Sequence, residues 1–253
     1  MDRLKAKVAI VTGAAQGMGR VIAEAYVAHG ARVAVVDSNA AGATEVAADL
    51  CRRFPDNAGD VAIPIGIDVS DEASVARMVA TVIERFARVD ILVNNAAVWK
   101  DLSRRPYWEV PVDEWDRVFA VNTRGPFLCT VAVTPAMIKQ GKGKIIYIGS
   151  ATIWTAQATL THYVSSKAAL IGLMHCVARE LGPHKICANI IHPGMTDTGG
   201  TTREYLEARA KLRLIPRVQE AGDIAGAAVF LAADESDFIT GQQLHVDGGV
   251  VLA

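Results

Sequence analysis

A tyrosine and a lysine stand four residues apart in this chain, Tyr163 and Lys167, and Ser150 lies thirteen positions before the tyrosine. Residues four apart share one face of a helix, so the Lys167 ammonium can lie beside the Tyr163 phenol. A phenol has an ordinary pKa of about 10, and a neighbouring cation favours the phenolate and lowers that pKa. The spacing therefore predicts a general base for an alcohol. Taken alone, it is also ordinary helix-surface spacing, in which both side chains only pack and contact water.

A glycine-containing loop near the start of the chain has the form G-x-x-x-G-x-G, from Gly13 through Gly17 to Gly19. It follows a short apolar run and opens a helix-like segment. Glycines there let the backbone turn tightly and approach a pyrophosphate, which the free N–H groups of the helix start attract. We expect a nucleotide to bind this loop, through Gly13, Gln16, Gly17, Met18 and Gly19.

An aspartate, Asp37, ends the next apolar run, about 20 residues beyond the loop. A carboxylate at that place accepts hydrogen bonds from the adenosine ribose hydroxyls and repels a 2′-phosphate. Neither Gln16 nor Ser38 is an Arg or Lys that could relieve this repulsion. The pattern favours NAD over NADP, although Asp37 could also be an ordinary surface aspartate. Asp68 and Val69, after the third apolar run, are weaker candidates for the adenine rim.

Short apolar runs alternate with helical patterns along the whole chain. The runs at residues 7–11, 32–36, 61–67, 90–93, 144–148, 186–191 and 243–246 are predicted strands. Helical periodicity covers residues 40–53, 71–86, 112–137, 162–181 and 221–232, and follows the glycine loop. This alternation predicts an α/β fold, one doubly wound domain over residues 1–253 with a parallel sheet of about seven strands and helices on both faces. Residues 194–217 interrupt the alternation and are a predicted lid.

Composition limits the function classes further. The chain has 253 residues, of which 51% are hydrophobic and 21% charged, with a net charge of −1 and no basic run. Nucleic acid is therefore not an expected partner. The four cysteines and six histidines show no metal-ligand spacing, so we expect no metal, and buried thiols in a reducing compartment. No stretch approaches the about 20 apolar residues of a membrane span, so a soluble, cytoplasmic protein is expected.

Together these motifs resemble the short-chain dehydrogenase/reductase family across nearly the whole chain. Its glycine motif is similar to residues 12–19 and its N-N-A-G motif to residues 94–97, with Ala97 where glycine is usual. The family's active-site asparagine matches Asn122, its Ser–Tyr–Lys set matches Ser150, Tyr163 and Lys167, and its P-G motif matches Pro193 and Gly194. The resemblance implies a Rossmann fold and a nicotinamide cofactor, which we expect to be NAD.

The resemblance also implies a role for each matching residue. Tyr163 exchanges a proton with the substrate oxygen, Lys167 binds the nicotinamide ribose and lowers the tyrosine pKa, Ser150 fixes the substrate oxygen, and Asn122 holds a water that links Lys167 to solvent. Thr198 would bond the nicotinamide carboxamide. The further cofactor contacts expected from the matched motifs are Asn95, Ala96, Pro193, Gly194 and Thr196.

The expected substrate pocket is aromatic and aliphatic, with Trp99, Thr152, Trp154 and Tyr205 as its candidate residues. No Arg or Lys cluster is evident there, although Lys100 and Arg203 could bind a carboxylate or phosphate. A small apolar or aromatic secondary alcohol or ketone fits such a wall, as in bacterial NAD-dependent aryl secondary-alcohol dehydrogenases, which the chain resembles most in look. Trp99 and Trp154 could instead belong to the core or to a subunit contact.

Other functions stay open at this point. A 3-oxoacyl, sugar or steroid reductase of the same family is one alternative, and a non-catalytic NAD(H)-sensing protein is another. The resemblance also implies a homotetramer, paired through helices at residues 112–137 and 162–181, for which Val164, Ala168, Ala169, Ile171 and Met174 could supply contacts.

Overall fold

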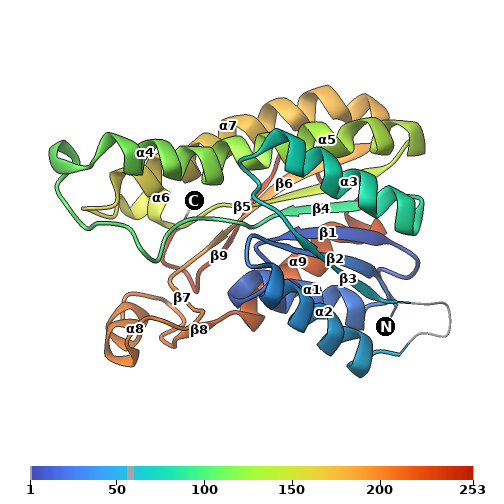
Figure 1. The fold of residues 1–253 in the computed structure, drawn as a ribbon. Helices are drawn as coiled ribbons and strands as arrows, with labels where there is room; N and C mark the ends of the chain where they lie inside the picture. Colours follow the sequence, from blue (N-terminus) through green and yellow to red (C-terminus); the bar gives the residue numbers. More distant parts are fainter. Residues whose placement is uncertain (1, 56–59, 253) are drawn as a thin grey trace.

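The computed structural model describes residues 2–55 and 60–252, so the two ends of the predicted domain, residues 1 and 253, lie outside the described residues. A parallel sheet of seven strands runs through it in the order β3-β2-β1-β4-β5-β6-β9 (Figure 1). The strands are β1 (Val8–Thr12), β2 (Arg32–Asp37), β3 (Ala62–Gly66), β4 (Ile91–Asn94), β5 (Gly143–Ile148), β6 (Ile186–Pro193) and β9 (Gln243–Val246). The predicted α/β class and parallel sheet are confirmed.

Helices cover both faces of the sheet, which explains why the strands read as continuous apolar runs. On one face lie α1 (Gly17–Ala28), α2 (Ala40–Arg53) and α9 (Gly222–Ala232), and on the other lie α3 (Glu72–Phe86), α5 (Gly125–Gln140) and α7 (Thr161–Leu181). Every residue of β1, β4, β5 and β6 is buried. Parallel strands with both faces covered have no polar side to present to water.

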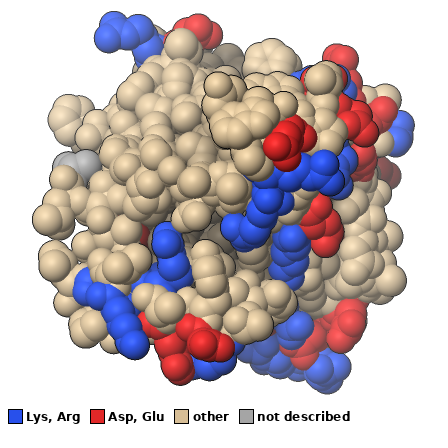
Figure 2. Space-filling model, turned by 90° about the vertical axis from the view of Figure 1, so that its left-hand side faces the viewer, with Lys and Arg blue, Asp and Glu red and all other residues tan. Residues whose placement is uncertain are grey.

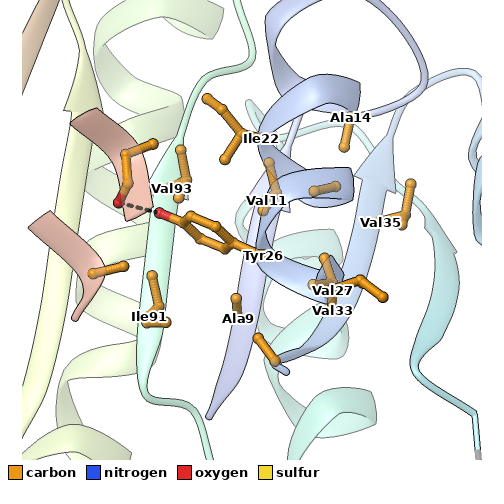
Figure 3. Close-up of a cluster of buried hydrophobic side chains, with 14 of the residues drawn as sticks. Ala9, Val11, Ala14, Ile22, Tyr26, Val27, Val33, Val35, Ile91 and Val93 are labelled. Carbon is orange, nitrogen blue, oxygen red and sulfur yellow. Dashed lines mark hydrogen bonds between the residues drawn. The ribbon is translucent and has the colours of Figure 1, made fainter. Parts of the chain in front are cut away.

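The core beneath α1 is anchored by one large side chain, Tyr26 (Figure 3). Its ring lies fully buried among the side chains of β1, β2 and β4, and its hydroxyl donates to the Ala228 carbonyl of α9, 3.0 Å away. A buried hydroxyl without a partner would cost free energy, so this bond lets a tyrosine fill the space between α1 and α9. The contact ties α1 to α9, about two hundred positions along the chain.

The direction of the chain across the sheet reverses between β1 and β4. From β1 the chain adds β2 and β3 on one side, then returns to add β4, β5, β6 and β9 on the other. At such a switch point the connections leave in opposite directions and open a crevice at the carboxyl ends of the strands. The glycine loop, Asp37, Asn95 and Ser150 all follow or end strands at this edge of the sheet.

Most predicted helix boundaries agree with the structure, and two are fixed by caps. Asp71 caps α3 by accepting a 2.6 Å bond from the Ser74 N–H, and Asn39 caps α2 by accepting from the Gly42 N–H. The helical segment predicted at residues 112–137 is divided into α4 (Val112–Phe119), a π-helical turn (Ala120–Arg124) and α5. Hydrophobic periodicity does not reveal a π turn, because one extra residue in one turn barely changes the pattern.

The predicted lid at residues 194–217 contains a short strand and a helix. β7 (Thr196–Asp197) pairs with β8 (Gln219–Glu220), and α8 (Arg203–Ala210) begins after Thr202, whose hydroxyl accepts from the Tyr205 N–H. Leu206, Ala210 and Val218 form a small core of their own with Met195. A short helix, α6 (Thr152–Thr155), follows β5 and was not predicted.

Candidate active site

A cavity of about 430 Å³ lies at the carboxyl ends of the strands, between the glycine loop and the segment that carries α8. Its wall is built by the ends of β1, β2, β4, β5 and β6 and by the starts of the helices that follow them. The fold thus brings together residues that are more than two hundred positions apart in the sequence, from Gly13 to Val250.

The glycine loop is compact enough to exclude any side chain at two of its positions. Gly13 has φ +65°, and a Cβ there would lie 2.8 Å from the Ala96 Cα. A Cβ on Gly19 would lie 2.2 Å from the Gly13 carbonyl oxygen. Asn95 holds the loop closed, because its side-chain amide donates to the carbonyls of Thr12 and Gly13. The bare backbone of this loop and the start of α1 are therefore open to a phosphate group.

The Asp37 carboxylate lies at the end of β2, and its oxygens accept bonds from the Ala15 N–H (3.0 Å) and the Asn39 N–H (2.9 Å). Backbone donors hold this carboxylate in place without neutralising its charge. Ser38, Ile67 and Asp68 line the same end of the cavity, and no Arg or Lys side chain of the described lining lies among them.

Ser150, Tyr163 and Lys167 meet at the other end of the cavity. Ser150 follows β5, and its Oγ accepts from the Thr152 N–H (3.2 Å) and lies 2.8 Å from the Thr152 Oγ1. The Ser150 hydroxyl lies close enough to the Tyr163 phenol to act on its pKa. The Lys167 Nζ lies 5.9 Å from the centre of the Tyr163 ring and donates to the Ile148 carbonyl at 2.8 Å. The spacing in α7 thus places the tyrosine and the lysine on one face, as predicted.

The charges in this group are set mainly by burial. Burial lowers the pKa of Lys167 to about 8, because the ammonium loses hydration. Burial raises the pKa of Tyr163, and the Ser150 hydroxyl acts in the opposite direction. The predicted lowering of the tyrosine pKa by Lys167 is therefore not produced by this chain's residues alone, since the ammonium bonds the Ile148 carbonyl and the phenol is desolvated.

Asn122 occupies the π-helical turn and is completely buried. Its Oδ1 accepts from the Val98 N–H (2.8 Å), and its Nδ2 donates to the Val98 carbonyl (3.2 Å) and the Ser166 Oγ (3.1 Å). These bonds fasten the segment after β4 to α7, next to Tyr163. Asn122 does not line the cavity, so in this structure it supports the wall from behind.

Comparison with known proteins gives one consistent answer. The family model described as enoyl-(acyl carrier protein) reductase matches residues 13–251. Sorbitol dehydrogenase of Cereibacter sphaeroides is 38% identical, with 98% of both chains covered. The chain belongs to the short-chain dehydrogenase/reductase family.

Other members of the family extend the match. The 3-oxoacyl-(acyl-carrier-protein) reductase FabG of Salmonella typhimurium is 36% identical, over 97% of this chain and 98% of the relative. A crystal structure of 3-ketoacyl-(acyl-carrier-protein) reductase from Brucella melitensis complexed with NADH has a TM-score of 0.89 at 31% identity, covering 98% of this chain and 100% of that one. This short-chain dehydrogenase/reductase is accordingly an NAD(P)-dependent oxidoreductase acting between secondary alcohols and ketones.

Most residues predicted for the site line the cavity of this dehydrogenase/reductase. Three predicted residues do not: Gly19, Asn122 and Trp154. Gly19 lies behind the loop that it shapes. The Trp154 ring packs edge-on against two histidine rings, with its centre 4.6 Å from that of His192 and 4.3 Å from that of His245. Its prediction as a pocket residue is therefore wrong, whereas Trp99, Thr152 and Tyr205 do line the cavity.

Sequence reasoning missed His192, which lies directly before Pro193 in β6 and is fully buried. Its Nδ1 accepts from the Ser150 N–H at 3.2 Å, and its Nε2 lies 3.2 Å from the Gln243 Oε1. These partners fix the tautomer with the proton on Nε2. Burial and the nearby His245 lower the pKa of His192 to about 4, so the ring stays neutral. The sequence signal was a histidine at the end of a strand otherwise made of apolar residues and one asparagine.

A second group that was missed is basic. Arg104, Arg209 and Arg213 line the cavity together with Lys100, whereas Arg203 pairs with Glu207 on the outer surface of α8. The expectation that the pocket holds no Arg or Lys cluster is therefore wrong. These residues come from two segments about a hundred positions apart, which no local pattern could bring together.

Cysteine and membrane predictions can also be compared with the structure. All four cysteines are free, with Cys129 and Cys187 buried, Cys51 partly buried and Cys176 exposed, so not all are the buried thiols that were expected. Within residues 2–55 and 60–252, no helix is long and apolar enough to cross a membrane.

Proposed function

We propose that this oxidoreductase uses NAD, that Ser150, Tyr163 and Lys167 carry its chemistry, and that Asn122 takes part by positioning the cavity wall beside Tyr163. The observation that supports this most directly is the meeting of Ser150, Tyr163 and Lys167 in one cavity with the glycine loop and Asp37. A proton acceptor, an oxygen-binding hydroxyl and a cation stand together at one end, and a nucleotide cradle lies at the other.

The residues present fit a nicotinamide dinucleotide. Thr198 has a buried hydroxyl that has no hydrogen-bond partner in the described protein, and it lies on the cavity wall. Buried hydroxyls are seldom left unpaired, so this oxygen suits a ligand amide. Gly13, Gln16, Gly17 and Met18 would hold the pyrophosphate, Asp37 the adenosine ribose, Asp68 and Val69 the adenine rim, and Lys167 the nicotinamide ribose. Asn95, Ala96, Pro193, Gly194 and Thr196 complete the wall.

The preference for NAD rests on charge. The Asp37 carboxylate faces the end of the cavity where a ribose would lie, and no basic side chain of the described lining accompanies it. A 2′-phosphate there would meet an uncompensated like charge, whereas two ribose hydroxyls would find an acceptor.

In the proposed reaction each residue acts at a stated atom. The Tyr163 phenolate oxygen takes the proton of the substrate hydroxyl, while the Ser150 Oγ donates a hydrogen bond to the same oxygen. Thr152 fixes the Ser150 Oγ through its N–H, so the donor is already oriented before substrate binds. When bound, the nicotinamide supplies the hydride acceptor and a positive charge that favours the phenolate. Lys167 adds a second positive charge next to the phenol at pH values below about 8.

Replacing the base tests this assignment. We expect Tyr163→Phe to lower kcat for NAD-coupled oxidation of secondary alcohols by about 100-fold or more, because the proton then has no acceptor of suitable strength. NADH formation would be followed by absorbance across a panel of aryl, alicyclic and polyol secondary alcohols. Tyr107→Phe, at an exposed tyrosine outside the cavity, is the matched control. Full turnover by Tyr163→Phe would show that the assignment is mistaken.

We also propose that residues 1–253 form one domain in which residues 194–217 act as a lid, and that the enzyme works as a homotetramer in the cytoplasm. Small cores such as that of Leu206, Ala210 and Val218 let a segment move as a unit, which supports the lid. Free cysteines support a reducing compartment.

A further inference from the structure

The charged side chains of the cavity are divided by sign along its length. Asp37 and Asp68 are the only carboxylates among the described residues that line the cavity. Asp37 ends β2, and Asp68 follows β3. Ser150 follows β5, three strands from β2, a separation of about 14 Å at the usual strand spacing. The cations Lys100 and Arg104 follow β4, and Arg209 and Arg213 belong to the segment that carries α8, so none of the four follows β2 or β3. Figure 2 shows Lys and Arg side chains gathered around a hollow at the centre of the face that carries α4, α6 and α8.

Two of these cations come from separate segments that both contact the stretch after Ser150. Arg104 follows β4 in the segment whose Leu102 packs with Trp99, Leu160 and Tyr163. Arg209 projects from α8 and donates to the Gln157 Oε1 at 3.2 Å, which ties the predicted lid to the loop beyond Ser150. Lys100 lies near the start of the same lid, with its Nζ 3.8 Å from the point where a Cβ on Gly200 would be.

None of these four cations has a carboxylate within 4.0 Å among the described residues, although most other arginines of the chain form such pairs. Arg209 bonds a neutral glutamine, and Arg213 bonds the carbonyls of Met195 and Arg217. Arg213 is 6% exposed, and its Nε is buried without a partner. Asp247 and Asp223 attract Arg213 from beyond ion-pair distance, and Arg217 and Arg209 repel it. A set of unpaired cations around a cavity is stabilised when an anion binds.

We propose that the substrate of this enzyme carries an anionic group, a carboxylate or a phosphate, and that Arg104 and Arg209 bind it at the mouth of the cavity with Lys100 nearby. This rests on the proposed function, because the secondary alcohol or ketone must reach Ser150 and Tyr163 while its charged end stays between the two arginines. Guanidinium groups bind carboxylate and phosphate oxygens through paired N–H donors. In place of the apolar substrate predicted from the sequence, we therefore expect a substrate with an apolar middle and an anionic end.

The pyrophosphate of the cofactor is the other anion that these side chains could contact. Its place is the start of α1, which leads on from β1, whereas Arg104 follows β4 and Arg209 reaches Gln157 after β5. The two explanations predict different kinetic changes. Loss of a substrate contact raises KM for the substrate, and loss of a pyrophosphate contact raises KM for NADH.

The test uses ketones that differ only in charge. Reduction with NADH would be measured for 3-oxobutanoate and 4-oxopentanoate against their methyl esters, and for dihydroxyacetone phosphate against dihydroxyacetone, with wild type, Arg104→Gln and Arg209→Gln. Arg105→Gln and Arg203→Gln are matched controls. Arg105 is the neighbour of Arg104 in the sequence, Arg203 lies on the same helix as Arg209, and neither control residue lines the cavity. Binding of each ketone to the NADH-loaded protein would be followed by NADH fluorescence.

We expect at least one anion to be used about tenfold or more efficiently than its neutral partner, and Arg104→Gln and Arg209→Gln to remove most of that difference through KM. In both variants the KM for NADH and the KM for each neutral ketone would be unchanged. The control variants Arg105→Gln and Arg203→Gln would keep the wild-type KM values for all ketones. Higher efficiency with the acids identifies a carboxylate substrate, and with the phosphate a phosphorylated one. Equal or better use of the neutral partners, or a parallel rise in KM for NADH, would overturn the proposal. If none of these ketones is turned over, their binding to the NADH-loaded protein decides. Charge-selective binding that is lost in both variants supports the anion site, and the absence of charge-selective binding overturns it, whereas the proposed function is decided by the panel of secondary alcohols.

Discussion

At the scale of single residues, the role expected of Asp37 depends on where its carboxylate lies in the cavity. Its type and its distance from the glycine loop predicted a ribose contact. The structure adds that two backbone N–H groups, of Ala15 and Asn39, hold the carboxylate at the cavity wall. The charge therefore stays fixed and unpaired within the described lining, which is what discrimination against a 2′-phosphate requires.

Removing this charge has a predictable effect on cofactor choice. We expect Asp37→Ala to narrow the preference for NAD over NADP by about tenfold, since the repulsion of the 2′-phosphate and the bonds to the ribose are both lost. Asp37→Asn keeps one of the two acceptor oxygens while removing the charge, and should narrow this preference as well. The measurement is the ratio of kcat/KM for NAD to that for NADP. A ratio that stays the same in both variants would refute the assignment.

At the scale of elements, the site depends on three strands that end side by side. β5 ends before Ser150, β6 carries His192, and β9 carries Gln243. Gly149 leaves room for the His192 ring, because a Cβ there would lie 2.3 Å from its Nδ1. Ser150 is thus oriented through its backbone N–H by a neutral histidine on the neighbouring strand.

This arrangement predicts a dependence of stability on pH. The pKa of His192 is lowered from 6.5 to about 4 in the folded protein, so the unfolded chain binds the proton more readily. Stability from this group is complete above pH 6.5 and decreases as the pH falls towards 4, by up to about 3 kcal/mol. We expect His192→Asn to lack this decrease, measured as urea unfolding at pH 7, 5 and 4. His175→Asn, at an exposed position of α7, should follow wild type, and a parallel decrease in His192→Asn would exclude the histidine as its cause.

At the scale of the whole molecule, apolar side chains remain exposed on α4 and α5. Phe127 is 49% and Val131 52% exposed, and Phe119, Phe127 and Leu173 line a shallow apolar groove there. Surfaces of this kind mark protein interfaces. Met174, which was considered for a subunit contact, lies in the core and is fully buried, so it cannot serve.

The proposed homotetramer can be tested on this surface. We expect Phe127→Asp to shift the assembly to smaller species in sedimentation velocity, because a desolvated charge in an apolar interface costs several kcal/mol. Thr81→Asp places the same charge on the exposed side of α3 and should leave the sedimentation coefficient unchanged. A wild-type protein that sediments as a monomer would contradict the tetramer, and an unaffected Phe127→Asp would place its interface elsewhere.

The sequence alone determined the class of fold, the order of its main elements and the site's core of Ser150, Tyr163, Lys167, glycine loop and Asp37. Each of these rests on local information: periodicity over one element, or residue types at a fixed spacing along one helix or loop. The start predicted for the third helix, at residue 71, lies one residue before the helix begins.

Only the tertiary structure decided what lies around that core. The π-helical turn at Asn122, the support of Ser150 by His192, the packing of Trp154 away from the cavity and the basic mouth formed by Arg104 and Arg209 depend on contacts between segments far apart in the chain. The direction in which burial moves the Tyr163 pKa was equally out of reach, because desolvation depends on every neighbour in space and not on the residue four positions along the helix.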